Sequence, residues 1–569
     1  MNYLALSNDS IARSDDSRSG GPEIQGLTKD GAVMASSRSA DFSERSEGAG
    51  RPVSRRRLLV AGAGAAAGSW LLTACGSGAS GTAAATSAAS GTAKAGGVLR
   101  IARPPASSAE TLDPASSLSA YEYLGALYSR LVRRGTDGNP AADLATSWEM
   151  SDNASTWTFH LRKGVTFHNG KSFTAADAAY TIGHILDPAT KSPQAGVLSS
   201  FVDTSGITAA DDTTLVVRLK TPHAEFPTLL MHYNCYVIPD GSGATIGKQG
   251  IGTGPFKLTS FTAAGKGAVA ANLDYYGGRP TLDSIDFSSI ADVQSRVNAL
   301  LAQQVDLIAQ TNLDAASVTT VMASSSATVV EVKNAEWYTL PMLCTAAPFT
   351  DTTVRQAFKL AYDPQQVMQL AIQNHGIIGH DNPVPTDDPY HVDYSVAPDP
   401  DKAKSLLKQA GHDGLKISLY TSDYDSVLTP LALAMKDSLA QAGITVAIQN
   451  APSDSYYTNV WMQKPFCTSY WYTGRPISQL LSEIFQTGSG YNESKWSNPT
   501  LDGLITSARK ETDAAKRKTL YADAQKLIVD QSGTIMPFFA SRMTGIGKNV
   551  VNYHESGFEF NYLTLGLKA

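Results

Sequence analysis

Residues 156–177 read TWTFHLRKGVTFHNGKSFTAAD, and this stretch decides how the rest of the chain is expected to fold. Its first apolar side chains alternate with polar ones: Trp157, Phe159 and Leu161. Such alternation predicts a strand that buries one face. Residues 162–164 predict a turn into a partner strand that carries Val165 and Phe167, and Asn169-Gly170 predicts a second tight turn. The stretch therefore predicts an antiparallel sheet.

The end of the same stretch predicts the start of a helix. Thr174, followed three residues later by Asp177, has the spacing of a capping box, in which the two residues satisfy each other's backbone N–H groups. We expect this helix to continue through Ile185. Asp187-Pro188 predicts its end, because the residue before a proline avoids helical backbone angles.

Other segments give local signals of the same kind. Residues 98–102 read as a short strand, and apolar residues near helical spacing predict a helix over 121–132. A later helix is predicted from Asp399 as N-cap, Pro400 at the first helical position and Gly411 at the C-terminal end.

With the residues before it, the opening stretch resembles the signature of family 5 extracellular solute-binding proteins, the peptide/nickel class that serves ABC importers. The matching positions are Trp148, Phe159, Leu161-Arg162, Gly164-Val165, Phe167-His168-Asn169-Gly170, Thr174-Ala175 and Asp177. The resemblance continues in Gly252-Thr253-Gly254-Pro255-Phe256, in 297–308, in 348–364 and in 399–411, and it spans nearly all of residues 97–569.

The resemblance implies an α/β fold of the two-lobed periplasmic-binding-protein type (class II, cluster C), with a ligand cleft between the lobes. It places lobe I at residues 97–335 plus 535–569 and lobe II at residues 336–534. Most of the signature residues are then expected to hold sheets and turns, with no direct contact to ligand.

Composition sets weaker limits. The chain has 569 residues and a formal net charge of −6, and this mild acidity argues against nucleic-acid binding. Cys235, Cys344 and Cys467 have no CxxC spacing, so neither a zinc site nor a disulfide scaffold is indicated. One disulfide and one free thiol remain open, and the sequence does not choose the pair.

The N-terminal region predicts export and lipid attachment. In residues 54–74, Arg55-Arg56-Arg57 precedes an uncharged apolar run too short for a spanning helix, which is typical of a signal peptide. The paired arginines resemble a twin-arginine signal, although general secretory signals carry arginines too. Leu72-Thr73-Ala74-Cys75 resembles a lipobox, so Cys75 is the predicted lipidation site. The alternative is a buried N-terminal helix with an incidental cysteine.

The segments on either side of the signal lack a core-forming pattern. Residues 1–53 are polar and are predicted to be a disordered leader; the alternative is a misplaced start codon, with Met34 as the true start. Residues 75–96 are rich in Gly, Ala, Ser and Thr, which predicts a flexible tether between the lipid and the folded part. The predicted location is therefore the outer face of the cell membrane, in the periplasmic space or on the cell surface.

The best candidate for ligand binding is the segment Tyr470-Trp471-Tyr472-Thr473-Gly474-Arg475-Pro476. Relatives that bind peptides carry an aspartate here that pairs with the ligand's α-ammonium, and this chain has none. Trp471 and Tyr472 could stack on a ligand or face a cation, and Arg475 could offer a bidentate fork to a carboxylate. The alternative is that the aromatic rings pack in the core and Arg475 points to water. Weaker candidates are Tyr121, Tyr123, Trp337 and Tyr338, each of which is expected to pack in the core.

Catalytic and metal signals are weak. His168 stands beside the Asn169-Gly170 turn, with no second ligand at metal spacing. Residues 374–391 hold three histidines in a Pro-rich segment, for which we expect a solvated loop. There is no GxSxG, HExxH, GxGxxG or P-loop pattern. The sequence thus predicts no catalytic residue, no metal and no cofactor.

The predicted function is that of a lipid-anchored solute-binding component of an ABC importer, which captures a peptide or another small organic solute. The expected partners are a permease and ATPase complex, and the protein is expected to be a monomer. Two other classes stay open: a secreted hydrolase, and a sensor or interaction lipoprotein on the same fold.

Overall fold

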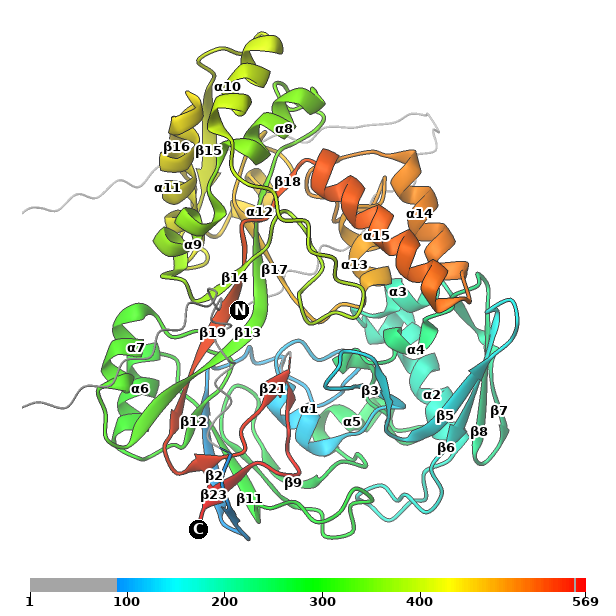
Figure 1. Ribbon diagram of the computed structural model, residues 1–569. Coiled ribbons are helices and arrows are strands. Elements are labelled where there is room, and N and C mark those ends of the chain that lie inside the picture. The colour runs from blue at the N-terminus through cyan, green and yellow to red at the C-terminus, as the bar shows by residue number, and fades with distance from the viewer. Residues whose placement is uncertain (1–89, 557–558) are drawn as a thin grey trace, which may run out of the picture. The chain divides into compact units, whose positions relative to one another are not determined.

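The computed structural model describes residues 90–556 and 559–569, apart from the side chain of Ser556 (Figure 1). The predicted leader, the signal peptide, the lipidation site Cys75 and most of the tether lie outside these residues. The described part is a mixed α/β structure with several sheets.

The largest sheet has ten strands in the order β17-β13-β19-β12-β2-β11-β10-β9, with β14 paired to β19 and β18 paired to β13. Its strands are β2 (Val98–Arg103), β9 (Phe256–Phe261), β10 (Gly267–Ala271), β11 (Ser284–Ser289), β12 (Leu307–Ile308), β13 (Ala327–Pro341), β14 (Gly376–Ile378), β17 (Ser469–Tyr472), β18 (Thr534–Ile535) and β19 (Phe538–Gly547). The predicted strand at 98–102 is confirmed as β2. Because β13 and β19 are long and pair along most of their length, they form the backbone of this sheet.

The opening stretch lies in a four-stranded antiparallel sheet of order β5-β6-β8-β7. The strands are β5 (Ala145–Met150), β6 (Thr156–Leu161), β7 (Val202–Asp211) and β8 (Thr214–Leu219). The alternation predicted for Trp157, Phe159 and Leu161 is confirmed, since all three are buried. The predicted partner strand at residues 165–167 is wrong: β6 pairs with β5 and β8, and only an isolated bridge, Thr166 to Ser172, forms around the Asn-Gly turn.

The predicted capping box is confirmed at the start of α2 (Ala175–Leu186). The Thr174 N–H donates to Asp177 Oδ2 at 2.8 Å. The helix ends at Asp187, as the following proline predicts. Helix α2 covers the four-stranded sheet, where it contacts β7 and β8.

The predicted helix over 121–132 is too long. Helix α1 (Tyr121–Leu127) stops because its last carbonyl meets the GTGP turn: the Gly254 N–H donates to the Leu127 oxygen at 2.9 Å. A Cβ atom on Gly252 would lie 2.0 Å from the same oxygen, so only glycine allows this approach. A long-range contact, absent from any local pattern, therefore ends the helix.

Residues 352–531 form mostly helices around one small parallel sheet of β15 (Lys416–Thr421) and β16 (Thr445–Asn450). The helices are α8 (Thr352–Ala361), α9 (Pro364–Ile372), α10 (Pro400–Gln409), α11 (Leu428–Leu439), α12 (Tyr456–Asn459), α13 (Ile477–Ile484), α14 (Pro499–Lys510) and α15 (Ala514–Gln531). Helix α10 is capped by Asp399, as predicted, and Gly411 follows its end with φ +79°.

The remaining elements are short. They are β1 (Ala93–Lys94), β3 (Val132–Arg134), β4 (Pro140–Ala142), β20 (Val550–Val551), β21 (Glu555–Ser556), β22 (Glu559–Phe560), β23 (Gly566–Lys568), α3 (Ala195–Ser199), α4 (Phe226–Leu229), α5 (Gly243–Gln249), α6 (Val293–Leu301) and α7 (Ala315–Met322). The helix-then-strand prediction at 297–308 is confirmed as α6 followed by β12. Cys235, Cys344 and Cys467 carry free thiols.

Several hydrophobic cores lie within this structure. Two draw mainly on residues 99–330, and two others draw mainly on residues 337–540. The predicted lobe boundary between residues 335 and 336 falls inside β13, and the one between 534 and 535 falls inside β18. The ten-stranded sheet therefore runs continuously past both boundaries, and the division into two lobes stays a prediction.

Candidate functional site

The predicted ligand segment begins on β17, which pairs with β13 in an antiparallel ladder. The paired residues are Glu336 with Tyr472, Trp337 with Trp471 and Tyr338 with Tyr470. Successive side chains of a strand point to opposite faces. Trp337 and Trp471 therefore share one side, the tryptophan face. The other side, the tyrosine face, carries Glu336, Tyr338, Tyr470 and Tyr472.

The tryptophan face lies in a core. Trp337 and Trp471 are 1% and 8% exposed, and their rings stack with centroids 6.0 Å apart. Both belong to a buried cluster with residues of α13, α14 and α15. This is the placement that the core alternative describes, and contact of Trp337 or Trp471 with a ligand stays a prediction.

A buried carboxylate, missed in the sequence, completes the tryptophan face. Glu493 is 2% exposed. It accepts hydrogen bonds from the Thr339 hydroxyl at 2.7 Å and from the Trp461 indole N–H at 3.0 Å. Burial raises the pKa of Glu493, and these donors oppose the rise. This carboxylate is held by neutral donors inside the fold.

The tyrosine face carries charge; Tyr338 is fully buried, whereas Glu336, Tyr470 and Tyr472 are half-buried. Tyr470 stacks on Tyr338 with centroids 5.7 Å apart. The Tyr338 hydroxyl lies between two carboxylates, 2.9 Å from Glu336 Oε2 and 3.0 Å from Asp425 Oδ1. Burial, and then the nearby charge of Asp425, raise the pKa of Glu336 to about 7. Burial also raises the pKa of Asp425.

A buried arginine lies next to this face. Arg542, on β19, forms an ion pair with Glu555, which also accepts a hydrogen bond from the Tyr553 hydroxyl at 2.5 Å. The positive charge of Arg542 also lowers the pKa of Glu336, although burial and Asp425 outweigh it. Arg542 therefore lies within electrostatic reach of both Glu336 and Glu555.

Arg475 is held within its own segment. Its Nε lies 3.0 Å from Glu483 Oε2, its Nη1 donates to the Tyr472 carbonyl at 2.9 Å, and its guanidinium lies over the Trp471 ring at 5.5 Å. Burial, and then the charge of Arg475, lower the pKa of His232 to about 3. Arg475 thus lies near residues of the N-terminal segment, and its predicted role as a fork for a ligand carboxylate stays a prediction.

Tyr121 opens helix α1. It is 7% exposed, its hydroxyl donates to the Leu118 carbonyl at 2.8 Å, and its ring meets Tyr233 edge-on with centroids 4.9 Å apart. Because Tyr233 follows His232, Tyr121 belongs to the same neighbourhood as Arg475. Its predicted contact with a ligand is likewise a prediction.

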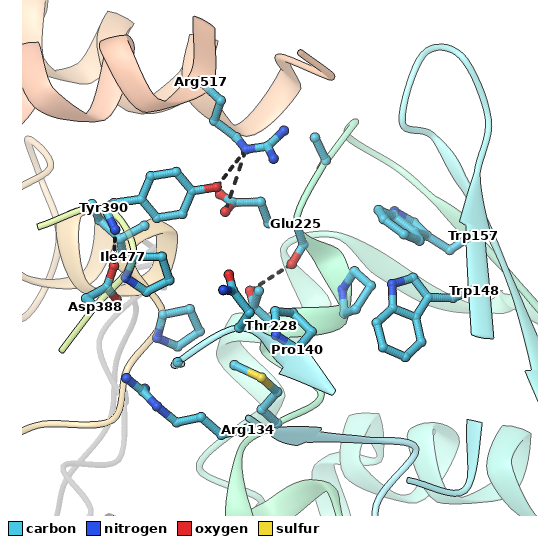
Figure 2. Close-up of a pocket in the computed structure, with 17 residues that line it drawn as sticks. Arg134, Pro140, Trp148, Trp157, Glu225, Thr228, Asp388, Tyr390, Ile477 and Arg517 are labelled. Atoms are coloured by element: carbon cyan, nitrogen blue, oxygen red, sulfur yellow. Dashed lines mark hydrogen bonds and ion pairs between the residues drawn. The ribbon is translucent and has the colours of Figure 1, made fainter. Parts of the chain in front are cut away.

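A pocket begins where the predicted segment ends (Figure 2). It is a cavity of about 160 Å³, and residues of both the N-terminal and the C-terminal segments line it. Trp148, Trp157, Thr228 and Met231 come from the first, and Asp388, Tyr390, Pro476, Ile477 and Arg517 from the second. Trp148 and Trp157, which the sequence assigns to the sheet, also have side chains that line this pocket.

Glu225 ties the two walls of the pocket together. It is buried, accepts a hydrogen bond from the Tyr521 hydroxyl at 2.7 Å and lies 3.7 Å from Arg517 Nε. Arg517 in turn donates to the Tyr390 hydroxyl at 2.9 Å, and the Ala224 N–H donates to the Arg509 carbonyl at 2.6 Å. Burial raises the pKa of Glu225, and the tyrosine hydroxyls and Arg517 oppose that rise.

The charged residues of the pocket carry no motif in the sequence. Burial raises the pKa of Asp388 to about 6, and its carboxylate accepts from the Tyr390 N–H at 2.9 Å. Glu225, Asp388 and Arg517 are isolated charges in a loop, a loop and a helix. Only the pairing of distant segments brings them together, so no local signal could have found them.

His168 has a structural role. His168 Nε2 lies 3.1 Å from the Gly254 carbonyl oxygen and its Nδ1 accepts from the Gly252 N–H at 3.3 Å, so it holds the GTGP turn. The expectation of a solvated loop at 374–391 is wrong for Asp381, Asn382 and Val384, which are buried. Within residues 90–556 and 559–569, no group of three or more His, Cys, Asp or Glu could hold a metal ion.

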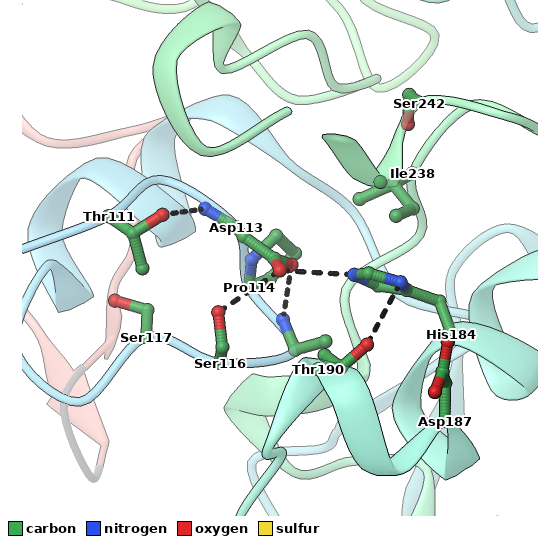
Figure 3. Close-up of polar contacts among 12 residues, drawn as sticks. Thr111, Asp113, Pro114, Ser116, Ser117, His184, Asp187, Thr190, Ile238 and Ser242 are labelled. Carbon is green, nitrogen blue, oxygen red and sulfur yellow. Dashed lines mark hydrogen bonds and ion pairs between the residues drawn. The ribbon is translucent and has the colours of Figure 1, made fainter. Parts of the chain in front are cut away.

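One cluster has the order of groups found in hydrolytic triads (Figure 3). His184 Nε2 lies 3.0 Å from Asp113 Oδ2, and the Thr190 hydroxyl lies 3.2 Å from His184 Nδ1. Asp113 also accepts from the Ala115 N–H and the Ser116 hydroxyl, each at 3.0 Å. The cluster therefore fastens the end of α2 to the turn at 113–116.

Comparison with known proteins decides the family. The family description "Bacterial extracellular solute-binding proteins, family 5 Middle" matches residues 139–493. The chain belongs to this family. A glutathione-binding protein, GsiB, from Pectobacterium atrosepticum is 28% identical over 403 residues, which is 68% of this chain and 77% of that protein.

Solved structures agree on the fold. The ABC transporter substrate-binding protein CtaP from Listeria monocytogenes superposes with a TM-score of 0.74 at 22% identity, over 84% of this chain and 100% of that one. The periplasmic binding protein DppA from Helicobacter pylori, in complex with the peptide STSA, gives 0.67 at 23% identity, over 84% and 99%. The predicted family and periplasmic-binding-protein fold are confirmed. As a member of this family, the protein is a solute-binding component of an ABC importer.

Proposed function

We propose that this protein is a lipid-tethered receptor that captures a small peptide between residues 97–335 and residues 336–534 and delivers it to a membrane permease. The observation that carries the proposal is the pocket of Figure 2, whose walls come from both segments and are joined through Glu225. Ligand pockets commonly lie at such junctions and combine apolar walls with a few polar groups.

The two segments act in this proposal as lobes I and II, with residues 535–569 completing lobe I. Each has hydrophobic cores of its own, and the long strands β13 and β19 cross between them. Such an arrangement supports closure by hinge motion, in which ligand shifts the population toward the closed form. Glu225 with Tyr521 and Arg517 then stabilises the closed form.

A peptide is favoured over other solutes by the relatives. GsiB is a glutathione-binding protein, and DppA was solved with a peptide. The absence of aspartate in Thr473-Gly474-Arg475 means that another carboxylate must receive the ligand's amino group. Another small organic solute is the alternative.

The sequence supplies the evidence for the proposed membrane anchor. The proposal places the lipid on Cys75, with the following Gly/Ala/Ser/Thr-rich residues as the tether. In the described part, no helix is long and apolar enough to cross a bilayer. Ala93 and Lys94, near the end of the predicted tether, pair with β23 at Lys568 and Leu567, which supports an attachment of the tether at this edge of lobe I. Comparing the membrane fractions of wild-type protein and Cys75→Ser tests the anchor, and equal retention would contradict it.

Ligand binding is tested with the full chain carrying Cys75→Ser, by thermal stabilisation against glutathione, di- to pentapeptides, amino acids, sugars and metal chelates. A ligand at 100 times its Kd adds about 2.7 kcal/mol to the folded state. We expect peptides to give this shift. If only a non-peptide solute does, the peptide assignment is wrong and the solute-binding role stands.

A further inference from the structure

Four carboxylates with few matching cations lie along the tyrosine face and the elements next to it. We call them the acidic cluster: Glu122 on α1, Glu336 on β13, Asp425 before α11, and Glu555 on β21. They are linked in series. The charge of Glu555 raises the pKa of Glu122, Arg542 pairs with Glu555 and attracts Glu336, and the Tyr338 hydroxyl joins Glu336 to Asp425.

The charges of the cluster do not balance. Arg542 is already paired with Glu555, and the nearby Arg103 is paired with Glu110 at 2.8 Å. Within the described ranges, Glu122, Glu336 and Asp425 have no ion-pair partner. Buried charges are normally paired, because taking an unpaired carboxylate out of water is costly. These three carboxylates therefore make no direct ion pair; the charges of Arg103 and Arg542 act on Glu122 and Glu336 only as additional electrostatic attraction.

Glu122 gives independent evidence for a missing partner. Its side chain is buried, with a residue exposure of 1%, and Oε2 accepts from the Gln310 amide at 2.5 Å. Its other oxygen, Oε1, has no hydrogen-bond partner among the described residues. A buried acceptor left unpaired costs free energy comparable to a lost hydrogen bond, so this oxygen calls for a donor from outside the fold.

Aromatic rings adjoin the same region. Tyr470 lies 5.6 Å from Tyr472 and 6.5 Å from Tyr424, and Tyr424 lies 5.1 Å from Tyr457, measured between ring centroids. Tyrosine faces attract cations. Tyrosines beside unpaired carboxylates form a surface suited to ammonium or guanidinium groups.

The geometry points to the acidic cluster as the part of the ligand site that selects a solute with at least two positive charges, either a basic peptide or a polyamine. This inference deepens the proposed function and rests on it. The ligand's cations would take the places of the missing partners of Glu122, Glu336 and Asp425, and at least one would replace the contact made elsewhere in the family by aspartate.

The acidic cluster also links the positive charge of the ligand to the closure of the two proposed lobes. Glu122 and Glu555 belong to the proposed lobe I, Asp425 belongs to lobe II, and Glu336 lies at the boundary on β13. Like charges on two lobes repel each other and oppose closure. A ligand shifts a conformational equilibrium only by its different affinity for the two states, and a dication between these carboxylates binds the closed state better.

The decisive experiment compares four probes by calorimetric titration of the full chain carrying Cys75→Ser: Lys-Ala-Lys, Ala-Ala-Ala, Glu-Ala-Glu and spermidine. We expect Lys-Ala-Lys or spermidine to bind at least tenfold more tightly than Ala-Ala-Ala, and Glu-Ala-Glu to bind most weakly. Tight binding of spermidine alone supports the acidic cluster but contradicts the peptide in the proposed function. Equal affinity for the three peptides would overturn the inference and leave the proposed function standing.

Matched variants locate the effect. Glu336→Gln and Asp425→Asn keep the shape of the side chains and should weaken binding of the basic probe at least tenfold, and binding of Ala-Ala-Ala by a smaller factor. Asp423→Asn is the control, since this exposed carboxylate of the same loop faces Thr429 and Asn450. Loss of affinity for all peptides alike, or an equal effect of Asp423→Asn, would contradict the assignment.

A pH series gives a readout that misfolding would not produce. The groups around Glu336 are Asp425, Arg542, Tyr338 on its own strand, Tyr472 on β17 and Glu555 beyond Arg542. The bound cation needs ionised carboxylates, so affinity for spermidine should rise roughly five- to tenfold from pH 6 to pH 7.5. The rise should be smaller in Glu336→Gln. A wild-type affinity that is flat over this range would overturn the inference.

Discussion

The two faces of the β13–β17 ladder use the same backbone for different purposes. On the tryptophan face, Glu493 is held by the Thr339 hydroxyl and the Trp461 N–H, and Trp337 and Trp471 are buried against it. On the tyrosine face, Glu336 shares one hydroxyl with a second carboxylate, Asp425. The first face satisfies its carboxylate with neutral donors of the fold. On the second face the Tyr338 hydroxyl lies between two carboxylates, of which Asp425 also accepts from the Val427 N–H, and this arrangement fits the cation-binding role inferred for this face.

The difference shows why burial alone does not identify a site. Both faces hold carboxylates whose pKa is raised by burial. The two faces differ in the hydrogen-bond donors that their carboxylates have. Mutations can remove these donors or the carboxylates, so the difference can be tested. Four predictions, from the largest expected effect to the smallest, test this comparison.

The largest effect is expected at the centre of the tryptophan face. Trp337→Ala should lower the free energy of unfolding by about 3–5 kcal/mol, because it empties a fully buried site. Tyr472→Ala, at the half-buried edge of the other face, should cost about 1–2 kcal/mol. Urea unfolding of both variants measures the difference, and equal losses would break the comparison.

The next effect concerns the carboxylate of the tryptophan face. Glu493→Ala should cost about 2–4 kcal/mol, because the Thr339 hydroxyl and the Trp461 N–H lose their buried acceptor. Trp461→Phe combined with Thr339→Val in the Glu493→Ala background removes the unpaired donors and should recover part of the loss. No recovery in thermal melts would mean that the two donors do not account for the cost.

The tyrosine face should show the opposite response to neutralisation. The pKa of Glu336 is about 7 in the folded protein, above the ordinary value near 4.5. A carboxyl with a raised folded pKa stabilises the fold below its unfolded pKa and loses that contribution as pH rises through the folded pKa. Glu336→Gln should therefore match wild type near pH 4.5 and be more stable by about 1–2 kcal/mol at pH 8, after discounting for its partial exposure.

Melting temperatures of wild type and Glu336→Gln between pH 4.5 and pH 8 measure how the stability difference between the two proteins grows with pH. Asp423→Asn supplies the baseline for a solvated carboxylate in the same region. A Glu336→Gln protein that is less stable than wild type at pH 8 would show that its carboxylate is satisfied by the fold, as Glu493 is.

The smallest effect is expected from the shared hydroxyl. Tyr338→Phe keeps the ring stacked on Tyr470 and removes one donor, so it should cost about 1 kcal/mol or less. It should also raise the pH midpoint of spermidine binding, since the hydroxyl lowers the pKa of both carboxyls. An unchanged midpoint would show that the Tyr338 hydroxyl does not affect the titration of Glu336 and Asp425.

Local sequence predicted the parts of the fold that depend on near neighbours. The strand of Trp157, Phe159 and Leu161, the capping box of Thr174 and Asp177 and the start of α10 at Pro400 are confirmed. The partner strand at 165–167 was wrong because β6 finds its neighbours at 145–150 and 214–219. Strand partners are set by long-range pairing, which local alternation does not encode.

The sequence by itself indicated the family and many of the local elements, and it predicted a ligand-binding role for residues 470–476. Periodicity, caps and turn residues act over a few positions, and the chain displays them directly. Only the tertiary structure decided that Trp471 and Tyr472, adjacent in sequence, belong to different surfaces. It also brought Glu122, Glu336, Asp425 and Glu555 together, because electrostatic interactions depend on distance in space, and these residues are 89 to 433 positions apart along the chain.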